Sequence, residues 1–349
     1  MNWKDIRLAY WPYHASCAVP GDRRRFIFYA KERKINFELA NPSHKYDIVL
    51  LTYGCNLAKW MAYKKANPGT KIIFELIDSY LMEDAGLFTF FRGCIRYFAK
   101  RESKLYLNYK KALKKMLTQC DAVICSTPIQ KENMKGLNNN IHVSLDYFSD
   151  DITQHKESFE TNGKLKLVWE GQAYTVKNLL VINDVLEKLK DDIELHIITD
   201  SDIKFPFKIF DKKTADVLKP LKCTWHFHNW EKKNFSSIIS DSDLAIIPIT
   251  SSQKIMWNKP ENKMLLLWEI GVPVLASATP AYKRVMDEAG LDFYCTTENE
   301  WVEKIRRYKN STSDEKKVYV GKADAYLRSR HSKELLLEKW DRIFESVMN

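Results

Sequence analysis

Two neighbouring stretches decide the fold: SDSDLAIIPI at residues 240–249 and NKPENKMLLLWEIGVPVLAS at residues 258–277. The first contains a short apolar run that stops at Pro248, which predicts a buried strand. The second starts with polar residues, continues as an apolar helical segment, and passes through Gly271 into another apolar run. A buried strand, a helix and a second buried strand in this order are typical of a parallel sheet covered by helices on both faces.

The same alternation of short apolar runs and amphipathic segments is found in both halves of the chain, which becomes largely helical after Glu298. Between the halves, the polar segment Ser149–Lys164 shows no hydrophobic periodicity and predicts an interdomain linker. We therefore expect an α/β protein built from two similar units. The expected parts are an N-terminal domain over residues 1–155, a C-terminal domain over residues 156–325 and a final helix over residues 326–349.

Composition limits the class of protein. The 349 residues are 45% hydrophobic and 29% charged, which is enough for two domains with their own hydrophobic cores. No run approaches the ~20 apolar residues that span a bilayer, and the N-terminus lacks the apolar segment of a signal peptide, so we expect a cytoplasmic protein. The seven cysteines form no CxxC pair, which indicates reduced thiols and argues against a structural zinc site.

Two α/β units in tandem are compatible with three classes of protein. A two-domain dehydrogenase needs a GxGxxG turn after a strand, and this sequence contains none. A periplasmic-type binding protein needs an export signal, which is also missing from the sequence. The class that stays compatible is a nucleotide-sugar glycosyltransferase with two Rossmann-like domains.

The stretch Trp225–Ser277 resembles the donor-binding half of the GT-B glycosyltransferases, in particular the large, mostly retaining, GT4-like group called glycosyl transferases group 1. The matching residues are Asp243 and Pro248 on the strand, the polar start of the helix, and the turn Gly271–Ser277. The resemblance implies the GT-B fold, in which two facing Rossmann-like domains have parallel sheets and a C-terminal helix crosses back to the first domain. It also implies a hexosyltransferase-type enzyme (EC 2.4) that uses a nucleotide-sugar donor and needs no metal or other cofactor.

The start of the predicted helix Glu261–Ile270 is the candidate site for the diphosphate of the donor. A helix N-terminus offers unpaired N–H groups and a partial positive charge, and lysines there add full charges. The alternative is that these lysines form an ordinary solvated face. The candidate residues are Lys254, Glu261, Asn262 and Lys263.

The resemblance also concerns the ribose of the donor. In the family, a glutamate five residues before the glycine binds the ribose, and this chain has Leu266 at that position. Glu269, one helical turn later, is expected to take the role from a shifted register, and Glu261 is a further candidate.

The segment Leu165–Leu180 resembles the family's second phosphate-binding element, a strand followed by Gly-Arg and then by a lysine that opens a helix. Here Gly171 is followed by Gln172 in place of the arginine, and Lys177 opens the predicted helix Asn178–Leu189. A lysine at this place stabilises the departing phosphate electrostatically, so Lys177 is a catalytic candidate. As an alternative, it is an ordinary surface residue.

The segment HFHNW, residues 226–230, occupies the family's position beside the nucleobase, where main-chain contacts from Trp230 are expected. His226 and His228 lie two apart on a strand and so share one face, which makes a metal site conceivable. The sequence indicates no third ligand, and we expect a structural role for both histidines.

In the N-terminal half, the loop after the first predicted strand contains His14 and Gly21. The glycine matches loosely a family position at which the backbone approaches the phosphates, and His14 is a candidate base or acceptor contact. Asp78 follows the predicted strand KIIFEL, residues 71–76, and is expected to face the crevice at the carboxyl ends of parallel strands. An inverting enzyme needs such a base to deprotonate the acceptor hydroxyl, whereas a retaining enzyme has no obligatory one.

Nearly all of the net charge of +10 comes from the N-terminal half, where residues 1–155 contain 24 Lys and Arg against 15 Asp and Glu. Nine basic residues and one acid lie within residues 88–117, interleaved with aromatic residues, and a long helix is predicted within Phe90–Leu117. Such a segment binds anionic lipid, although a solvated face is the alternative. The sequence contains no recognised nucleic-acid-binding module, so we expect no nucleic-acid partner.

Together these features predict a glycosyltransferase that transfers a sugar from a nucleotide-sugar donor to a hydroxyl of a cell-surface glycan or a lipid-linked glycan. The resemblance implies retention of configuration. We expect a role in polysaccharide biosynthesis and a peripheral position at the inner face of the cell membrane. The competing class is a non-catalytic α/β protein that binds nucleic acid or sugar.

Overall fold

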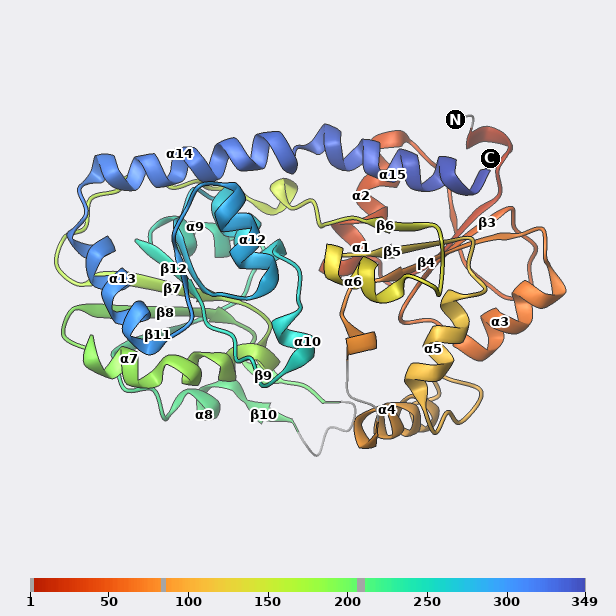
Figure 1. The fold of residues 1–349 in the computed structure, drawn as a ribbon, viewed down its shortest axis with the longest axis horizontal. Helices are drawn as coiled ribbons and strands as arrows, with labels where there is room; N and C mark the ends of the chain where they lie inside the picture. Colours follow the sequence, from red (N-terminus) through yellow and green to blue (C-terminus); the bar gives the residue numbers. More distant parts are fainter. Residues whose placement is uncertain (1–2, 83–85, 206–210, 349) are drawn as a thin grey trace. The chain divides into compact units, whose positions relative to one another are not determined.

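The computed structural model describes residues 3–82, 86–205 and 211–348. The chain divides into two compact units (Figure 1). Unit 1 comprises Met1–Tyr147 and Lys333–Asn349, and unit 2 comprises Phe148–Ser332. Each unit is built on a six-stranded sheet in which every pair of neighbouring strands is parallel. None of the helices in the described ranges is long and apolar enough to cross a membrane.

The sheet of unit 1 has the order β2-β1-β3-β4-β5-β6. Its central strands are mostly apolar, and they are buried along their whole length except at Lys71, as expected for strands covered on both faces. The strands are β1 (Leu8–Trp11), β2 (Glu38–Leu39), β3 (Ile48–Thr52), β4 (Lys71–Leu76), β5 (Ala122–Cys125) and β6 (Ile141–Val143).

Helices cover both faces of this sheet. Alternate strand residues pack against α3 and α5 on one face and against α2 and α15 on the other, which gives unit 1 two separate apolar clusters. The helices are α1 (Pro20–Arg23), α2 (Phe26–Arg33), α3 (Leu57–Ala66), α4 (Leu87–Phe98), α5 (Tyr109–Leu117), α6 (Pro128–Met134) and α15 (Lys333–Met348).

The prediction of one long helix within Phe90–Leu117 is wrong. Helix α4 ends at Phe98, and α5 begins at Tyr109 behind Asn108, whose side chain accepts a hydrogen bond from the Lys111 N–H at 2.9 Å. The intervening loop folds onto α4 at Gly93, where an added methyl group would overlap the carbonyl oxygen of Tyr106. Only a glycine permits this approach of two backbones, and this contact separates the two helices.

The final helix, α15, belongs to unit 1 and not to the unit that precedes it in the sequence. Its apolar residues join the cluster beneath β1, β3 and β4. Trp340 stacks on Tyr29 with 5.6 Å between ring centres, and Tyr29 donates a hydrogen bond to Asp341 at 2.9 Å. The return of the C-terminal helix to the first unit, implied by the family resemblance, is thus present.

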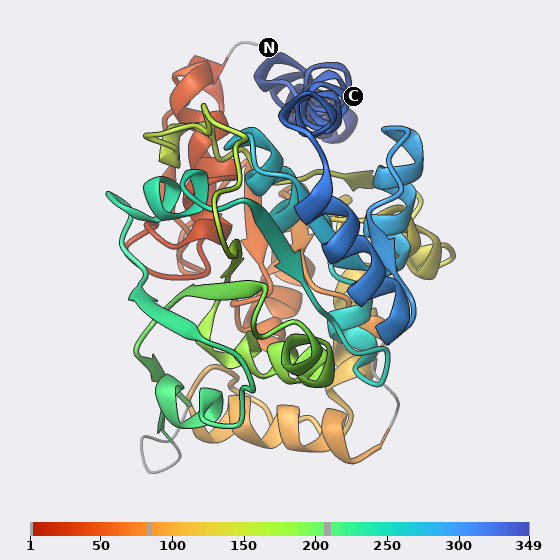
Figure 2. The ribbon, with the colours of Figure 1, turned by 90° about the vertical axis from the view of Figure 1, so that its left-hand side faces the viewer.

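The sheet of unit 2 has the order β11-β8-β7-β12-β13-β14, with helices on both sides (Figure 2). A short antiparallel pair, β9 (Asp202–Ile203) and β10 (Lys212–Lys213), follows strand β8. The strands of the main sheet are β7 (Leu165–Glu170), β8 (Ile193–Thr199), β11 (Trp225–Asn229), β12 (Leu244–Ile247), β13 (Val274–Ser277) and β14 (Tyr294–Cys295).

The helices of unit 2 differ from expectation in one place. The predicted helix Asn178–Leu189 is divided into a long 3-10 helix and a short α-helix, so that Lys177 lies inside the 3-10 helix instead of opening an α-helix. The helices are η4 (Ala173–Ile182), α7 (Asn183–Lys188), α8 (Thr214–Leu218), α9 (Phe235–Ser240), α10 (Lys254–Trp257), α11 (Asn262–Glu269), α12 (Pro280–Glu288), α13 (Glu298–Asn310) and α14 (Ser313–Arg330).

The segment Ser149–Lys164, predicted as a linker, is bound along its length to unit 2. The Lys156 ammonium donates to the carbonyl of Ser242 at 2.7 Å, and the Lys156 N–H donates to the carbonyl of Ile270 at 2.8 Å. Thr161 donates to the Asp243 carboxylate at 3.1 Å. The segment is held by hydrogen bonds of polar groups and not by a periodic row of apolar side chains. The hydrophobic pattern of the sequence therefore does not distinguish it from a free linker.

Replacing Trp340 by alanine tests how firmly α15 is held by unit 1. The side chain is 1% exposed, so Trp340→Ala should lower the free energy of unfolding by about 3–5 kcal/mol through lost burial and an unfilled cavity. The measurement is urea unfolding of the full chain, followed by circular dichroism.

The matched control is Arg342→Ala on the same helix, whose side chain is 64% exposed and which should change the free energy of unfolding by no more than about 0.5 kcal/mol. A loss below about 1 kcal/mol for Trp340→Ala would show that α15 contributes little to the core of unit 1.

Candidate functional site

In unit 2, the fold brings Gly171 and Lys263 together, although they are far apart in the sequence. Gly171 directly follows β7, and Lys263 lies in the first turn of α11. The Lys263 Nζ is 4.6 Å from the centre of the Trp169 ring. A methyl group added at Gly171 would overlap the Nζ, so the glycine is what allows the ammonium to approach the main chain here.

The Lys263 ammonium is in an environment that disfavours its charge. The pKa of Lys263 is lowered to about 8, chiefly because burial disfavours the charged form; Glu170 opposes this shift, and Lys259 adds to it. The indole face of Trp169 offers only a weak attraction to a cation. A phosphate group bound here would restore the favourable interactions that the ammonium has lost, as is typical of functional sites with perturbed groups.

Glu261, the further candidate for the ribose, directly precedes α11. Its side chain is buried and forms an ion pair with Arg284 of α12, which also contacts Glu288 at 3.1 Å. Burial raises the pKa of Glu261, and Arg284 opposes that shift. Because Arg284 balances the carboxylate, an anion at the start of α11 does not meet an uncompensated negative charge.

Arg284 was not singled out from the sequence, since it lies in the next helix and belongs to no motif. Tyr174 in η4 was missed in the same way. Its hydroxyl accepts a hydrogen bond from the Lys259 ammonium at 3.2 Å, and the same ammonium lies 5.5 Å from the centre of its ring. Lys259 thus joins the segment after β7 to the segment that leads into α11.

The other predicted residues near the start of α11 are more loosely placed. Lys254 is exposed and begins the short helix α10, and Asn262 is the partly buried first residue of α11. Gln172 and Lys177 are both exposed. The carbonyl of Gln172 accepts a hydrogen bond from the Thr175 N–H at 2.8 Å, which starts η4.

Trp230 and Glu269 have partners that bear on their predicted roles. The Trp230 N–H donates to the carbonyl of Thr199 at 3.0 Å, and its ring stacks on Phe235. Glu269 accepts a hydrogen bond from the Ser149 hydroxyl at 2.9 Å. It is the last residue of α11, about 9 Å along the helix from Lys263, and its role at the ribose stays a prediction.

In unit 1, Asp22 organises the loop that contains His14. Its fully buried carboxylate accepts hydrogen bonds from the Tyr10 hydroxyl at 2.6 Å, the Tyr13 N–H at 2.8 Å and the His14 N–H at 3.1 Å. The His14 ring itself is exposed and contacts the Ser16 hydroxyl at 2.8 Å. Gly21 lies in α1, where a methyl group would come within 3.1 Å of the Tyr13 ring.

Asp78 follows β4 and is partly exposed, with its carboxylate accepting a hydrogen bond from the Tyr80 hydroxyl at 3.1 Å. The other acid of this segment, Glu75, is buried inside β4 and bonded to Arg25 at 2.7 Å. Arg25 also contacts Asp146 at 3.1 Å. Glu75 therefore has a structural role inside the sheet, and Asp78 is the partly exposed acid that follows β4.

Helix α4 exposes its apolar side chains and turns its arginines inward. The Arg96 guanidinium is buried and donates to the carbonyl of Cys55 at 2.7 Å, and the Arg92 guanidinium lies 4.6 Å from the centre of the Tyr80 ring. The basic residues of this helix were predicted to face an anionic surface, and these two do not. The large apolar residues of α4 that are at least 39% exposed are Leu87, Phe90, Phe91, Ile95, Tyr97 and Phe98.

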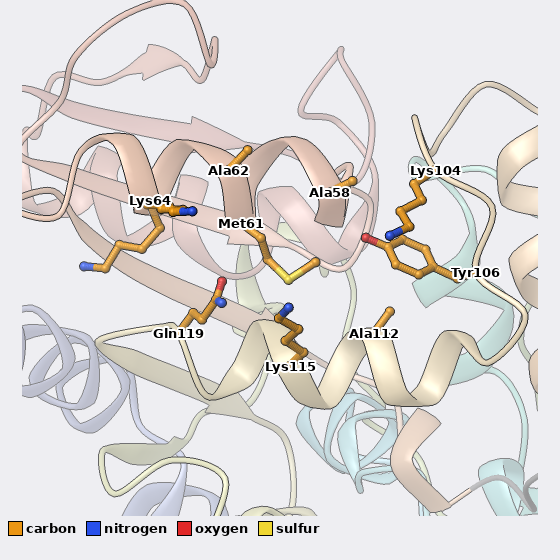
Figure 3. Close-up of a pocket in the computed structure, with 10 residues that line it drawn as sticks. Ala58, Met61, Ala62, Lys64, Lys104, Tyr106, Ala112, Lys115 and Gln119 are labelled. Atoms are coloured by element: carbon orange, nitrogen blue, oxygen red, sulfur yellow. The ribbon is translucent and has the colours of Figure 1, made fainter.

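A groove of about 640 Å³ lies between α3 and α5 of unit 1 (Figure 3). Met61 and Ala112 contribute apolar surface to it, and Lys104 and Lys115 contribute positive charge. None of the predicted donor-binding residues lines it. Its chemistry suits an amphipathic anion better than a nucleotide, because no acid or hydroxyl group other than that of Tyr106 is among its described lining residues.

Within the described ranges, one group of side chains places its donor atoms close enough to share a metal ion: Glu194, His196 and His226. These residues lie on β8 and β11. The absence of a metal at the donor site stays a prediction of the family resemblance.

No protein-family model and no curated protein sequence matches this chain. Solved structures do match. An alpha-glucosyltransferase in complex with UDP has a TM-score of 0.62 at 10% identity, over 99% of this chain and 100% of that chain. WaaG, a glycosyltransferase involved in lipopolysaccharide biosynthesis, has a TM-score of 0.59 at 14% identity, over 96% of this chain and 99% of that chain.

TarM from S. aureus, in a complex that contains UDP, has a TM-score of 0.55 at 13% identity over 85% of this chain. The chain spans about half of the length of the TarM structures, 55% and 54%. At these identities the likeness concerns the fold. The two six-stranded parallel sheets and the matches over nearly the whole chain confirm the expected architecture: this chain has the GT-B fold of glycosyltransferases.

Proposed function

We propose that this chain is a glycosyltransferase that binds a nucleotide-sugar donor on unit 2. The observation that carries the proposal is the position of the Lys263 ammonium. The ammonium lies against the main chain of Gly171, near the start of α11, and burial removes part of the hydration that its charge would have in water. A helix start of this kind binds phosphate through its N–H groups, and the ammonium adds a full charge. The GT-B fold supplies the context for a sugar donor.

UDP is the nucleotide that we favour. The matched structures of the alpha-glucosyltransferase and of TarM contain UDP. In our proposal, Lys263, Lys254 and the N–H groups around Asn262 hold the diphosphate. Trp230 lies beside the nucleobase in this proposal. The main-chain N–H of Trp230 is bonded to the carbonyl of Thr199, so its main-chain carbonyl is the group that would contact the base.

For the chemical step, we propose a hexosyltransferase-type reaction (EC 2.4) with retention of configuration and without a metal. Lys177, which is exposed on η4, would stabilise the departing diphosphate. On unit 1, Asp78 and His14 are the groups at the carboxyl ends of β4 and β1 that can contact the acceptor hydroxyl. In a retaining reaction the leaving phosphate can accept the proton of that hydroxyl.

The acceptor that we propose is a cell-surface or lipid-linked glycan at the inner face of the cell membrane, in polysaccharide biosynthesis. Three observations support it. WaaG acts in lipopolysaccharide biosynthesis, and α4 exposes an apolar surface of the kind that inserts into the interface of a bilayer. The groove between α3 and α5 combines apolar and lysine side chains, which suits a lipid with an anionic headgroup.

A nucleotide titration tests the proposed function. UDP, GDP, CMP and dTDP are titrated into the full chain by calorimetry, and at least one, with UDP preferred, should bind with one-to-one stoichiometry. Lys263→Met should weaken that binding at least tenfold, the equivalent of about 1.4 kcal/mol, because the ammonium is lost from the phosphate site. Gly171→Ala should also weaken it, because the added methyl group displaces the Nζ.

The control is Gly321→Ala in α14, where an added methyl group meets nothing within 4 Å and binding should be unchanged. If all four nucleotides fail to bind, the donor site and the transferase are refuted, and the competing reading as a non-catalytic binding protein gains support. Hydrolysis of the matching nucleotide sugar, followed by nucleotide release, then separates an enzyme from a binding protein.

The pKa of Lys263 predicts how nucleotide binding depends on pH. A diphosphate prefers the charged lysine, whose pKa in the free protein is about 8, so the affinity should fall roughly tenfold between pH 7 and pH 9. In Lys263→Arg the charge persists over this range, and the affinity should stay nearly constant. Calorimetry at both pH values measures the difference, and an equally steep fall in the arginine variant would contradict the assignment.

The same pKa affects the stability of the free protein. The folded-state pKa lies below the ordinary value of 10.5, so the charged lysine destabilises the folded state below pH 8. This cost should diminish as the pH rises from about 8 towards 10.5, because the unfolded chain then binds the proton more tightly than the folded one. Lys263→Met should abolish that part of the pH dependence.

Membrane association is tested with the double variant Phe91→Ser, Phe98→Ser on α4. These side chains are 54% and 70% exposed, and each buries apolar area worth about 1.5–3 kcal/mol on insertion. Binding to vesicles that contain phosphatidylglycerol, measured by co-sedimentation, should therefore weaken at least tenfold.

Val318→Ser serves as the control, because Val318 is 61% exposed on α14 of unit 2 and lies outside the proposed membrane surface. Unchanged vesicle binding of the double variant, or an equal loss for Val318→Ser, would exclude α4 as the membrane contact.

A further inference from the structure

Strands β8 and β11 place four polar side chains on one face of the sheet of unit 2. The strands are parallel, and His226 is directly opposite His196. Because successive side chains alternate between faces, Glu194 shares the face of His196, and His228 shares the face of His226. The residues between them point the other way: Leu195 belongs to the apolar cluster on the opposite face.

The donor atoms of three of these side chains are close together. The Nε2 of His196 is 3.4 Å from one carboxylate oxygen of Glu194, and the Nε2 of His226 is 3.8 Å from the other. Donor atoms of all three residues lie within 4.8 Å of one another. A tetrahedral zinc ion with bonds of about 2.0–2.1 Å needs separations of about 3.4 Å, which small side-chain rotations would provide here.

His228 contacts the ring nitrogen of His196 that does not face Glu194. Its Nε2 is 3.0 Å from the Nδ1 of His196. When His196 binds a metal through Nε2, its Nδ1 carries the proton and donates it to His228. Metal-binding histidines typically have such a partner for their second nitrogen, which fixes the tautomer and the orientation of the ring.

We propose that Glu194, His196 and His226 form a binding site for a divalent transition metal, with zinc as the preferred ion. Two imidazoles and one carboxylate suit zinc, cobalt or nickel, whereas magnesium and calcium favour oxygen ligands. His226 has 46% of its side-chain surface exposed, so a water molecule from solvent can take the fourth position. His228 acts as a positioning residue for His196.

The site is separate from the proposed donor site. His196 is in register with Val168 of β7, three residues before Gly171, so the metal would lie about 10 Å along the sheet from the carboxyl ends of the strands. Strand β11 is at the edge of the sheet, where β8 is its partner. A metal bound by residues of both strands would tie this edge strand to the sheet and stabilise the fold.

The test is a metal titration of the full chain, without a histidine tag and after removal of metals by a chelator. Zinc should bind with one equivalent per chain in calorimetry and should raise the temperature of unfolding. Cobalt should give the visible absorption of a tetrahedral site with nitrogen and oxygen ligands. His226→Ala and the isosteric Glu194→Gln should each weaken zinc binding at least tenfold.

The positioning role of His228 has its own readout. His228→Ala should weaken zinc binding by about 10- to 100-fold at unchanged stoichiometry, because His196 loses its orienting partner. His228→Gln keeps a hydrogen-bond acceptor near the Nδ1 of His196 and should restore most of the affinity.

The matched control is His44→Ala. His44 is similarly exposed, at 51% of its side chain, and likewise lies near a single glutamate, Glu38, at 3.9 Å. This variant should bind zinc like the wild type. The proposal is overturned if no saturable zinc binding occurs, if Glu194→Gln and His226→Ala bind as tightly as the wild type, or if the cobalt spectrum shows cysteine thiolate ligands.

Discussion

A parallel strand that is apolar throughout has to be covered on both faces, and this constraint organises both units. The strands β3, β5, β12 and β13 are buried along their whole length, so helices must pack on both sides of each sheet and the chain must return to the same edge after every strand, whereas β8 and β11 carry polar side chains on one face. All loops that follow strands therefore gather at one edge of the sheet. In unit 1, Asp78 and His14 follow strands and so lie at this edge of their sheet, and in unit 2 Gly171 lies at the corresponding edge of the other sheet.

The charge of Lys263 links this architecture to function. The helix that covers the sheet after β12 begins near the end of β7, and the lysine of its first turn has to share space with Trp169. An apolar residue would pack there at a lower cost in desolvation. Burial makes a charged lysine costly at this place, and Trp169 and Glu170 offset only part of that cost, which is the physical reason for proposing a bound anion here.

Much of the fold is predictable from the sequence, because burial of continuous apolar runs is a local property. Strand β4 matches its predicted bounds, Lys71–Leu76, and the helix after residue 260 is also correctly expected. The stretch from Phe90 to Leu117 is not, because its break depends on a tertiary contact between Gly93 and the Tyr106 carbonyl. A helical pattern of side chains contains no information about such a contact.

The candidate site shows the same limit. Gly171 and Lys263 are identifiable from motifs, yet the Arg284 partner of Glu261 lies in another helix, and no spacing rule connects the two. The three hydrogen bonds accepted by Asp22 depend on how a loop closes. The neighbours of His226 follow from strand order, since β8 and β11 are paired across the intervening segment. Tertiary neighbours of this kind are absent from a local pattern.

The glycine at position 93 has a consequence for how this protein can change. Its missing side chain is the space in which the Tyr106 carbonyl lies, and that contact holds α4 with Arg92 and Arg96 towards the protein. Even an alanine there would push the loop away and allow the helix to rotate. The orientation of the exposed apolar residues of α4 therefore depends on position 93, although this glycine is itself buried.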